Sequence, residues 1–188
     1  LFTPRPDAPL STTLRNLIDN PTAGQVISLA AGMPDPDYYP PSIFSPLFDA
    51  TDAAANAHYG HLATEGFGPL RQSLAKQLSE QGLHAKPENI LITTGSQQGL
   101  YLAAKAFLEP QDTVIVETPG YFGGTQIFES LGARVLSLPM GESLNLALLE
   151  DHLIRYRPKL FYTVPNYQNP TGRLMPLHER HEILRLAA

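Results

Sequence analysis

The pattern of hydrophobic and polar positions becomes regular from Asn89 onward. Short apolar runs there alternate with segments in which apolar residues recur every three or four positions. Such runs are typical of strands buried on both faces, and such recurrence is typical of amphipathic helices. The predicted strands cover residues 90–94, 113–117, 133–138 and 160–164, and the predicted helices cover residues 96–108, 121–131, 148–156 and 176–188. The alternation predicts an α/β fold with a mostly parallel sheet flanked by helices.

The first part of the chain is less regular. We expect a short helix over residues 11–19 and a strand over residues 26–30, followed by a proline-rich loop over residues 32–41 with neither helix nor strand. Helices are then expected over residues 42–56 and around Leu70, Leu74 and Leu78, the second ending at Gly82. This organisation indicates an N-terminal arm and loop, residues 1–41, and a domain over residues 42–188. That domain reads as truncated, because its last helix has no terminating glycine or proline.

Composition excludes several function classes. Hydrophobic residues make up 43% of the 188 residues and charged residues 16%, so a sizeable core can form. No window approaches the roughly 18 apolar residues of a membrane span. The net charge of −5, without a basic block, predicts no nucleic-acid binding by this segment. The absence of cysteine excludes disulfides, thiolate metal sites and a cysteine nucleophile, and the start lacks a signal-peptide pattern, so we expect a cytoplasmic protein.

Candidate chemistry gathers where the predicted strands end. In TTGSQQG, residues 93–99, Gly95 permits a tight turn, and Ser96 and Gln97 then open a helix whose free N–H groups suit a phosphate. The same pattern also fits an ordinary turn in which Ser96 caps the helix. In ETPGYFG, Tyr121 could stack on a flat ring or simply pack, and in VPNYQNPTG the amide of Asn169 could donate to an oxygen or simply form a turn.

Other polar positions carry weaker signals. Tyr59 lies in a glycine-flanked polar loop, and Gly32 lies in the proline-rich loop. The histidines, including His178 and His181 on one helix face, show no spacing that favours a metal site.

Five motifs occur in order from about Val26 to the end: SLAAGMPDPDYYP, HYG…TEGFGPLR, ITTGSQQGL, VETPGYFG and VPNYQNPTG. In these motifs the sequence resembles the class I/II aminotransferases, which are pyridoxal-phosphate enzymes of fold type I. It is most similar to the branch that contains aminoadipate and kynurenine aminotransferases, and to aminotransferase-like regulators. The resemblance implies that the chain is the N-terminal half of such a protein.

The resemblance also implies roles for residues. Gly95, Ser96 and Gln97 would bind the phosphate of pyridoxal 5'-phosphate, Tyr121 would stack on its ring, and Asn169 would hydrogen-bond its phenolic oxygen. Tyr59 would reach the phosphate of the neighbouring subunit, which implies a homodimer with shared sites. Gly32, with Tyr59 and Asn169, would line the substrate pocket.

The catalytic lysine of this family, which forms a Schiff base with the cofactor, would lie beyond Ala188. No lysine follows Gly172, and Lys76, Lys86, Lys105 and Lys159 match no such position. We therefore expect that this polypeptide alone does not transaminate, because a lysine amine is the usual nucleophile.

Three hypotheses follow. The first is an aminotransferase that acts on an amino acid and a 2-oxo acid. The second is the effector-binding domain of a winged-helix transcriptional regulator, with the proline-rich start as a linker. The third is a remnant that keeps the fold and binds no cofactor.

Overall fold

The computed structural model describes residues 36–38, 42 and 63–188. The chain divides into two compact units, Leu1–His61 and Leu62–Ala188, and most of the described residues belong to the second. In the first unit, the described residues include a turn of 3-10 helix, η1, over Pro36–Tyr38, where the sequence predicted no helix. The prediction was wrong there because the fixed φ of proline suits the first position of a helical turn. The helix at 11–19, the strand at 26–30 and most of the helix at 42–56 lie outside the described residues, and the boundary between 41 and 42 stays a prediction.

A parallel sheet forms the centre of the second unit. Its described strands are β1 Thr113–Thr118, β2 Arg134–Pro139 and β3 Leu160–Tyr162, in the order β2-β1-β3. Ile115 of β1 stands in register with Leu136 of β2 and with Phe161 of β3. The parallel arrangement confirms the sequence prediction and brings the carboxyl ends of the strands to one edge.

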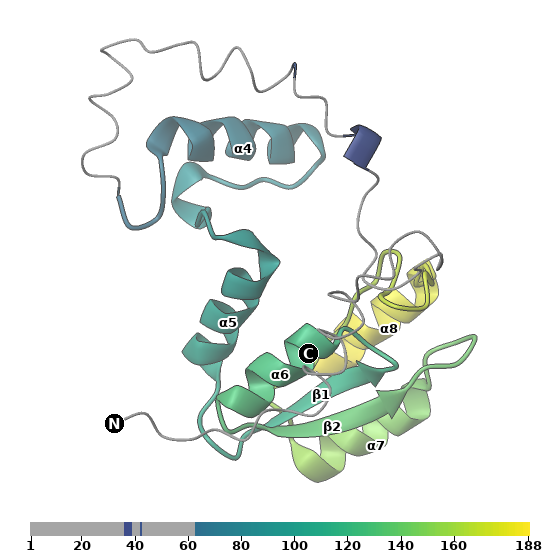
Figure 1. Cartoon of the computed structure of the whole chain (residues 1–188). Coiled ribbons are helices and arrows are strands. Elements are labelled where there is room, and N and C mark those ends of the chain that lie inside the picture. The colour runs from purple at the N-terminus through teal and green to yellow at the C-terminus, as the bar shows by residue number, and fades with distance from the viewer. Residues whose placement is uncertain (1–35, 39–41, 43–62) are drawn as a thin grey trace, which may run out of the picture. The chain divides into compact units, whose positions relative to one another are not determined.

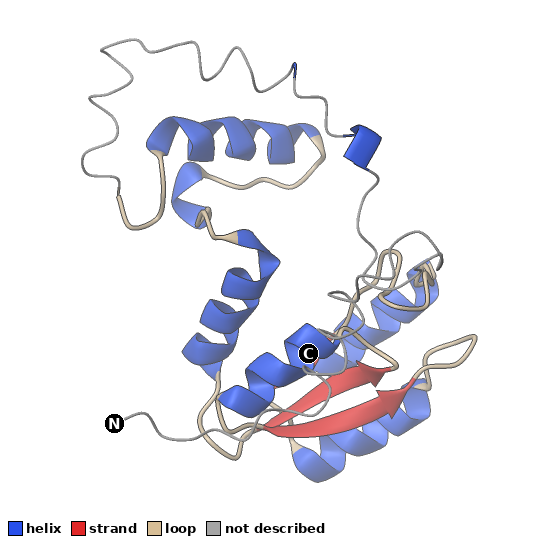
Figure 2. Cartoon of the chain, viewed as in Figure 1, coloured by secondary structure: helices blue, strands red, loops and turns tan. Residues whose placement is uncertain are grey.

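Helices cover both faces of this sheet (Figures 1 and 2). On one face, α5 Gly95–Phe107 and α6 Phe122–Ser130 form a core with Val114 and Val116 of β1. On the other, α7 Leu146–Tyr156 and α8 Leu177–Ala187 pack near Ile115. Successive residues of β1 thus point to opposite faces, which explains why its sequence is continuously apolar.

The helix α4 Gly68–Glu80 and the short turn η3 Pro87–Asn89 precede α5 and contact one another. The guanidinium of Arg71 donates to the carbonyl of Pro87 at 3.2 Å. The helix predicted around Leu70, Leu74 and Leu78 is confirmed as α4, which ends at Glu80, just before Gly82.

The strand predicted over residues 90–94 is wrong. This segment is not part of a sheet, and its Ile92 amide donates to the Glu65 carbonyl at 2.9 Å. The described residues provide no strand beside it, and an apolar run becomes a strand only when a partner pairs with its backbone groups. The strand predicted over 160–164 is confirmed but ends earlier, at Tyr162, because the Val164 amide donates to the side chain of Glu117.

Within the described residues, no helix is long and apolar enough to cross a membrane.

Candidate functional site

The loops that follow the three strands meet at the carboxyl edge of the sheet. They comprise residues 119–121 after β1, residues 140–145 after β2 and residues 163–176 after β3. In open α/β sheets ligands bind beyond this edge, so these loops and the start of α5 are the natural place to look for a site. Among the described residues, no group of three or more histidines and carboxylates could hold a metal ion.

The start of α5 has the features of an anion site. Gly95 adopts a φ of +73°, and a Cβ added there meets no described atom within 4 Å. Ser96 and Gln97 are exposed, and within the described chain no side chain caps this helix at Thr94. The Gly95 N–H donates to the Thr93 carbonyl at 2.9 Å, which leaves the N–H groups of Ser96 and Gln97 available to a ligand. The positive end of the helix dipole favours a phosphate there.

Tyr121 lies close to this helix start. A Cβ built on Gly123 of α6 would lie 2.7 Å from the Tyr121 hydroxyl oxygen and 3.0 Å from Nε2 of Gln97. The two side chains thus converge on a point that only a glycine leaves free. The structure brings together a phenol ring and an exposed helix start, an arrangement that fits a flat phosphorylated ring.

Tyr162 at the end of β3 lies against α6, where a Cβ built on Gly124 would be 3.0 Å from its ring. Its ring packs edge-on against Phe128, with centroids 5.8 Å apart. Burial raises the pKa of the Tyr162 phenol, and the charges of Tyr121 and Glu117 raise it further. Tyr162 therefore stays neutral at physiological pH and acts as an apolar wall with a hydroxyl at its tip.

Asn169 is exposed and makes no hydrogen bond with any other described residue, so its amide is free for a ligand. The structure gives no contact between Asn169 and Tyr121 or Gln97. Tyr59 and Gly32 lie outside the described residues. Their predicted roles, like those of the other site residues, stay predictions.

The sequence analysis missed two buried polar residues at this edge. Glu117, 4% exposed, accepts a hydrogen bond from the Thr163 hydroxyl and another from the Val164 amide at 3.2 Å. Gln168, 2% exposed, donates to the Pro119 carbonyl at 2.8 Å. The available signal was a carboxylate at the end of an apolar strand, where a charge needs partners if it is buried.

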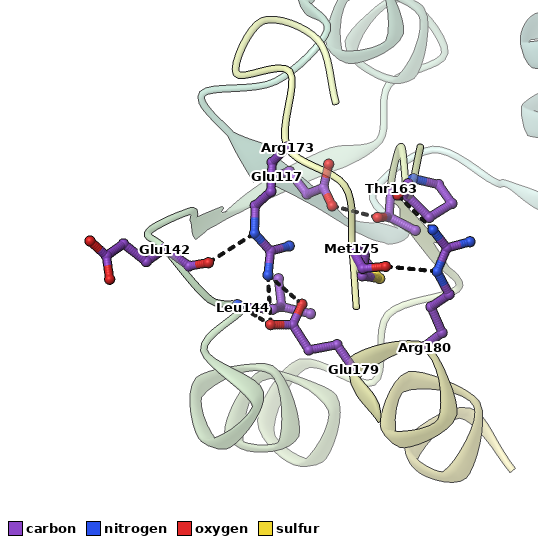
Figure 3. A network of polar contacts seen from close by, with 9 residues as sticks. Glu117, Glu142, Leu144, Thr163, Arg173, Met175, Glu179 and Arg180 are labelled. Atoms are coloured by element: carbon purple, nitrogen blue, oxygen red, sulfur yellow. Dashed lines mark hydrogen bonds and ion pairs between the residues drawn. The ribbon is translucent and has the colours of Figure 1, made fainter. Parts of the chain in front are cut away.

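A second polar cluster holds the far part of the loop after β3 (Figure 3). The guanidinium of Arg173 contacts both carboxylate oxygens of Glu179, at 2.6 and 2.7 Å, and donates to the Glu142 carbonyl at 3.0 Å. Glu179 also accepts from the Leu144 amide at 3.2 Å. In this ion pair one guanidinium nitrogen of Arg173 contacts both oxygens of Glu179, which fastens the loop to α8. The bond to the Glu142 carbonyl fastens it to the loop after β2.

Several known proteins are similar to this chain over most of its length. A 2-aminoadipate transaminase of Thermus thermophilus is 38% identical over 184 residues, which cover 94% of this chain and 44% of the relative. Helix-turn-helix transcriptional regulators also match, such as an uncharacterised one of Bacillus subtilis at 29% identity, with 94% of this chain and 37% of the regulator covered.

Two solved structures share the fold. The α-aminoadipate aminotransferase LysN of Thermus thermophilus, complexed with N-(5'-phosphopyridoxyl)-L-leucine, superposes with a TM-score of 0.78 at 35% identity, covering 93% of this chain and 43% of that one. The kynurenine aminotransferase of Pyrococcus horikoshii superposes with a TM-score of 0.80 at 32% identity, covering 96% and 45%. These structures confirm the fold type I α/β architecture.

The chain thus spans less than half the length of these aminotransferases. Pyridoxal phosphate, the cofactor implied by the resemblance, is supported by the family match and by the pyridoxyl derivative in the first structure. The model of the family "Aminotransferase class I and II" matches residues 25–188. The chain therefore belongs to the class I and II aminotransferase family.

Proposed function

We propose that the protein carrying this chain is a pyridoxal-phosphate-dependent aminotransferase that moves an amino group between an amino acid and a 2-oxo acid. The observation that carries this proposal is the convergence of Tyr121 and Gln97 on Gly123, beside the exposed first turn of α5. The cofactor, when bound, supplies the electron sink for the chemistry. The residues of this chain bind and orient it.

Each candidate residue has a role in this proposal. The turn at Gly95 presents the N–H groups of Ser96 and Gln97 and the Ser96 hydroxyl to the phosphate, and Tyr121 stacks on the ring. The Asn169 amide donates to the ring oxygen, which fixes the rotation of the ring in its plane. Gly32 lies near the carboxylate of the substrate.

The Schiff-base lysine is placed outside residues 1–188. Lys105 lies in the last turn of α5, at the opposite end of that helix from Gly95. The Lys159 amide donates to Thr113 at the amino ends of the strands. Both lysines are therefore remote from the carboxyl edge, where the ligand is expected.

The test uses the protein expressed from the complete reading frame that carries this chain. Binding of pyridoxal phosphate is followed by absorbance, and amino transfer is followed with a panel of amino acids and 2-oxo acids that includes 2-aminoadipate and kynurenine. Tyr121→Ala should raise the Kd for the cofactor about tenfold, through lost stacking. Tyr101→Ala is the matched control, because it removes another tyrosine, on the exposed surface of α5. Equal affinity of both variants would refute the assignment of Tyr121.

The proposal includes a cytoplasmic homodimer with shared sites, in which Tyr59 serves the neighbouring subunit. Mixing a Tyr59→Ala protein with a Tyr121→Ala protein tests this directly. Heterodimers of the two variants carry one intact site. At a pyridoxal phosphate concentration too low to saturate either variant, the mixture should therefore be more active than either variant alone. A mixture without recovery would contradict the shared site.

The second candidate is the effector-binding domain of a winged-helix regulator, which the match to helix-turn-helix regulators supports. Such a protein binds DNA, and its affinity for DNA changes with pyridoxal phosphate or an amino acid. An electrophoretic mobility assay with the complete protein distinguishes the two candidates.

A further inference from the structure

The loop after β3 is anchored on the loops that follow the other two strands. Gln168 reaches the Pro119 carbonyl in the loop after β1, and Arg173 reaches the Glu142 carbonyl in the loop after β2. Because β1 lies between β2 and β3, the loop after β3 crosses the end of the central strand. Asn169 lies between these two anchors.

The amide of Gln168 is fully engaged. Its Nε2 donates to the Pro119 carbonyl at 2.8 Å and lies 3.4 Å from a carboxylate oxygen of Glu117. Its Oε1 accepts from the amide and the hydroxyl of Thr171, at 3.0 and 2.7 Å. A single buried side chain therefore joins the turn that precedes Tyr121 to the turn that contains Asn169.

Glu117 completes this connection. Its carboxyl group accepts hydrogen bonds from Thr163, Val164 and Gln168 in the loop after β3. Glu117 itself lies near the carboxyl end of β1, two residues before Pro119. A buried carboxylate is tolerated only with such partners. The loop after β3 therefore supplies the hydrogen-bond donors that the buried carboxyl group of Glu117 needs.

We propose that Gln168 and Glu117 are positioning residues that set the placement of Asn169 relative to Tyr121. This inference rests on the proposed function, in which Tyr121 stacks on the cofactor ring and Asn169 donates to its oxygen. When Tyr121 fixes the plane of the cofactor ring, the phenolic oxygen of that ring points in one direction. A hydrogen bond weakens steeply when donor and acceptor move out of line, so the Asn169 amide must lie in that direction. Neither positioning residue touches the cofactor in this proposal.

The experiment measures the Kd for pyridoxal phosphate and the absorption spectrum of the bound cofactor in the complete protein. Gln168→Ala removes the bridge, and Thr163→Val removes one donor to Glu117 with little change in shape. Leu149→Val is the control, because Leu149 is buried in the core on the α7 and α8 face and its truncation lowers stability without touching the bridge. Urea unfolding of each variant supplies the stability against which affinity is compared.

The expected result for Gln168→Ala is a Kd raised about tenfold, the scale of one lost hydrogen bond to the ligand, together with a shifted absorption maximum. Thr163→Val should give a smaller change in the same direction, and Leu149→Val should keep both the spectrum and the Kd of the parent protein. If Gln168→Ala does not fold, Thr163→Val decides. An unchanged spectrum and Kd in both bridge variants would overturn the inference while leaving the proposed function intact. A parent protein that binds no pyridoxal phosphate would overturn both.

Discussion

The ion pair between Arg173 and Glu179 should make the carboxyl edge sensitive to the loss of either partner. The Glu179 side chain is 1% exposed and that of Arg173 is 13% exposed, so water replaces neither partner when the other is removed. Glu179→Ala leaves a buried guanidinium without its counter-ion and the Leu144 amide without its acceptor. Removing one partner of a buried ion pair costs about 3–5 kcal/mol, and we expect that loss in the free energy of unfolding.

A double-mutant cycle separates the pair from its surroundings. Arg173→Met and Glu179→Leu are made singly and together, and urea unfolding is followed by circular dichroism. We expect a coupling energy of about 2–3 kcal/mol between the two positions. The double variant should be more stable than either single variant, because two apolar side chains leave no unpaired charge.

Salt provides an independent check on this reasoning. The coupling between Arg173 and Glu179 should persist in 1 M salt, because buried pairs are screened much less than exposed ones. The exposed pair of Arg185 and Glu182 on α8, whose nitrogen and oxygen lie 2.5 Å apart, serves as the contrast and should lose its coupling. A coupling at Arg173 and Glu179 below about 0.5 kcal/mol, the range of exposed pairs, would refute the assignment of a buried ion pair.

Three further predictions concern single positions. Gly120→Ala places a Cβ 2.2 Å from the Glu117 carbonyl oxygen and should cost about 1–3 kcal/mol in urea unfolding; Gly141→Ala, whose nearest neighbour lies at 3.7 Å, should be nearly neutral. The pKa of Tyr162 is higher in the folded than in the unfolded protein, so the stability contributed by its protonated phenol is complete below about pH 10 and is lost as the pH rises through the folded pKa. The free energy of unfolding should therefore fall more steeply above about pH 10 in the parent protein than in Tyr162→Phe. Arg157→Gly should raise the melting temperature, because Arg157 ends α7 with a φ of +43° and glycine relieves a strain of about 1 kcal/mol there; an unchanged or lower melting temperature would contradict that strain.

Much of the fold was predictable because the local sequence pattern indicates where its helices and strands lie. β1 is a continuous apolar run, and α5 and α6 each begin directly after a turn with glycine or proline. The segment 90–94 shows the limit of such reasoning. Its apolar run resembles that of β1, but strand formation depends on a neighbour, which a local pattern does not specify.

The candidate site was predictable to the same extent. Gln97 and Tyr121 were candidates because each stands at the start of a predicted helix, and the structure has both helix starts, although only Tyr121 follows a strand. Their convergence on Gly123 was not predictable, since it depends on how closely α5 approaches α6. The bonds of Glu117 were also hidden, because its partner Thr163 lies 46 positions away and the pairing arises only when β3 joins β1.

The central position of β1 also bears on how the molecule opens. Val114, Ile115 and Val116 are buried, and β1 is paired along both of its edges. Its amide hydrogens can exchange with water only when β2 or β3 separates from it, so the sheet should exchange as one cooperative unit and more slowly than the surrounding helices. Tyr121 and Asn169 follow strands of that same unit. Fluctuations that fray the helix ends therefore leave these two residues attached to the part of the molecule that opens last.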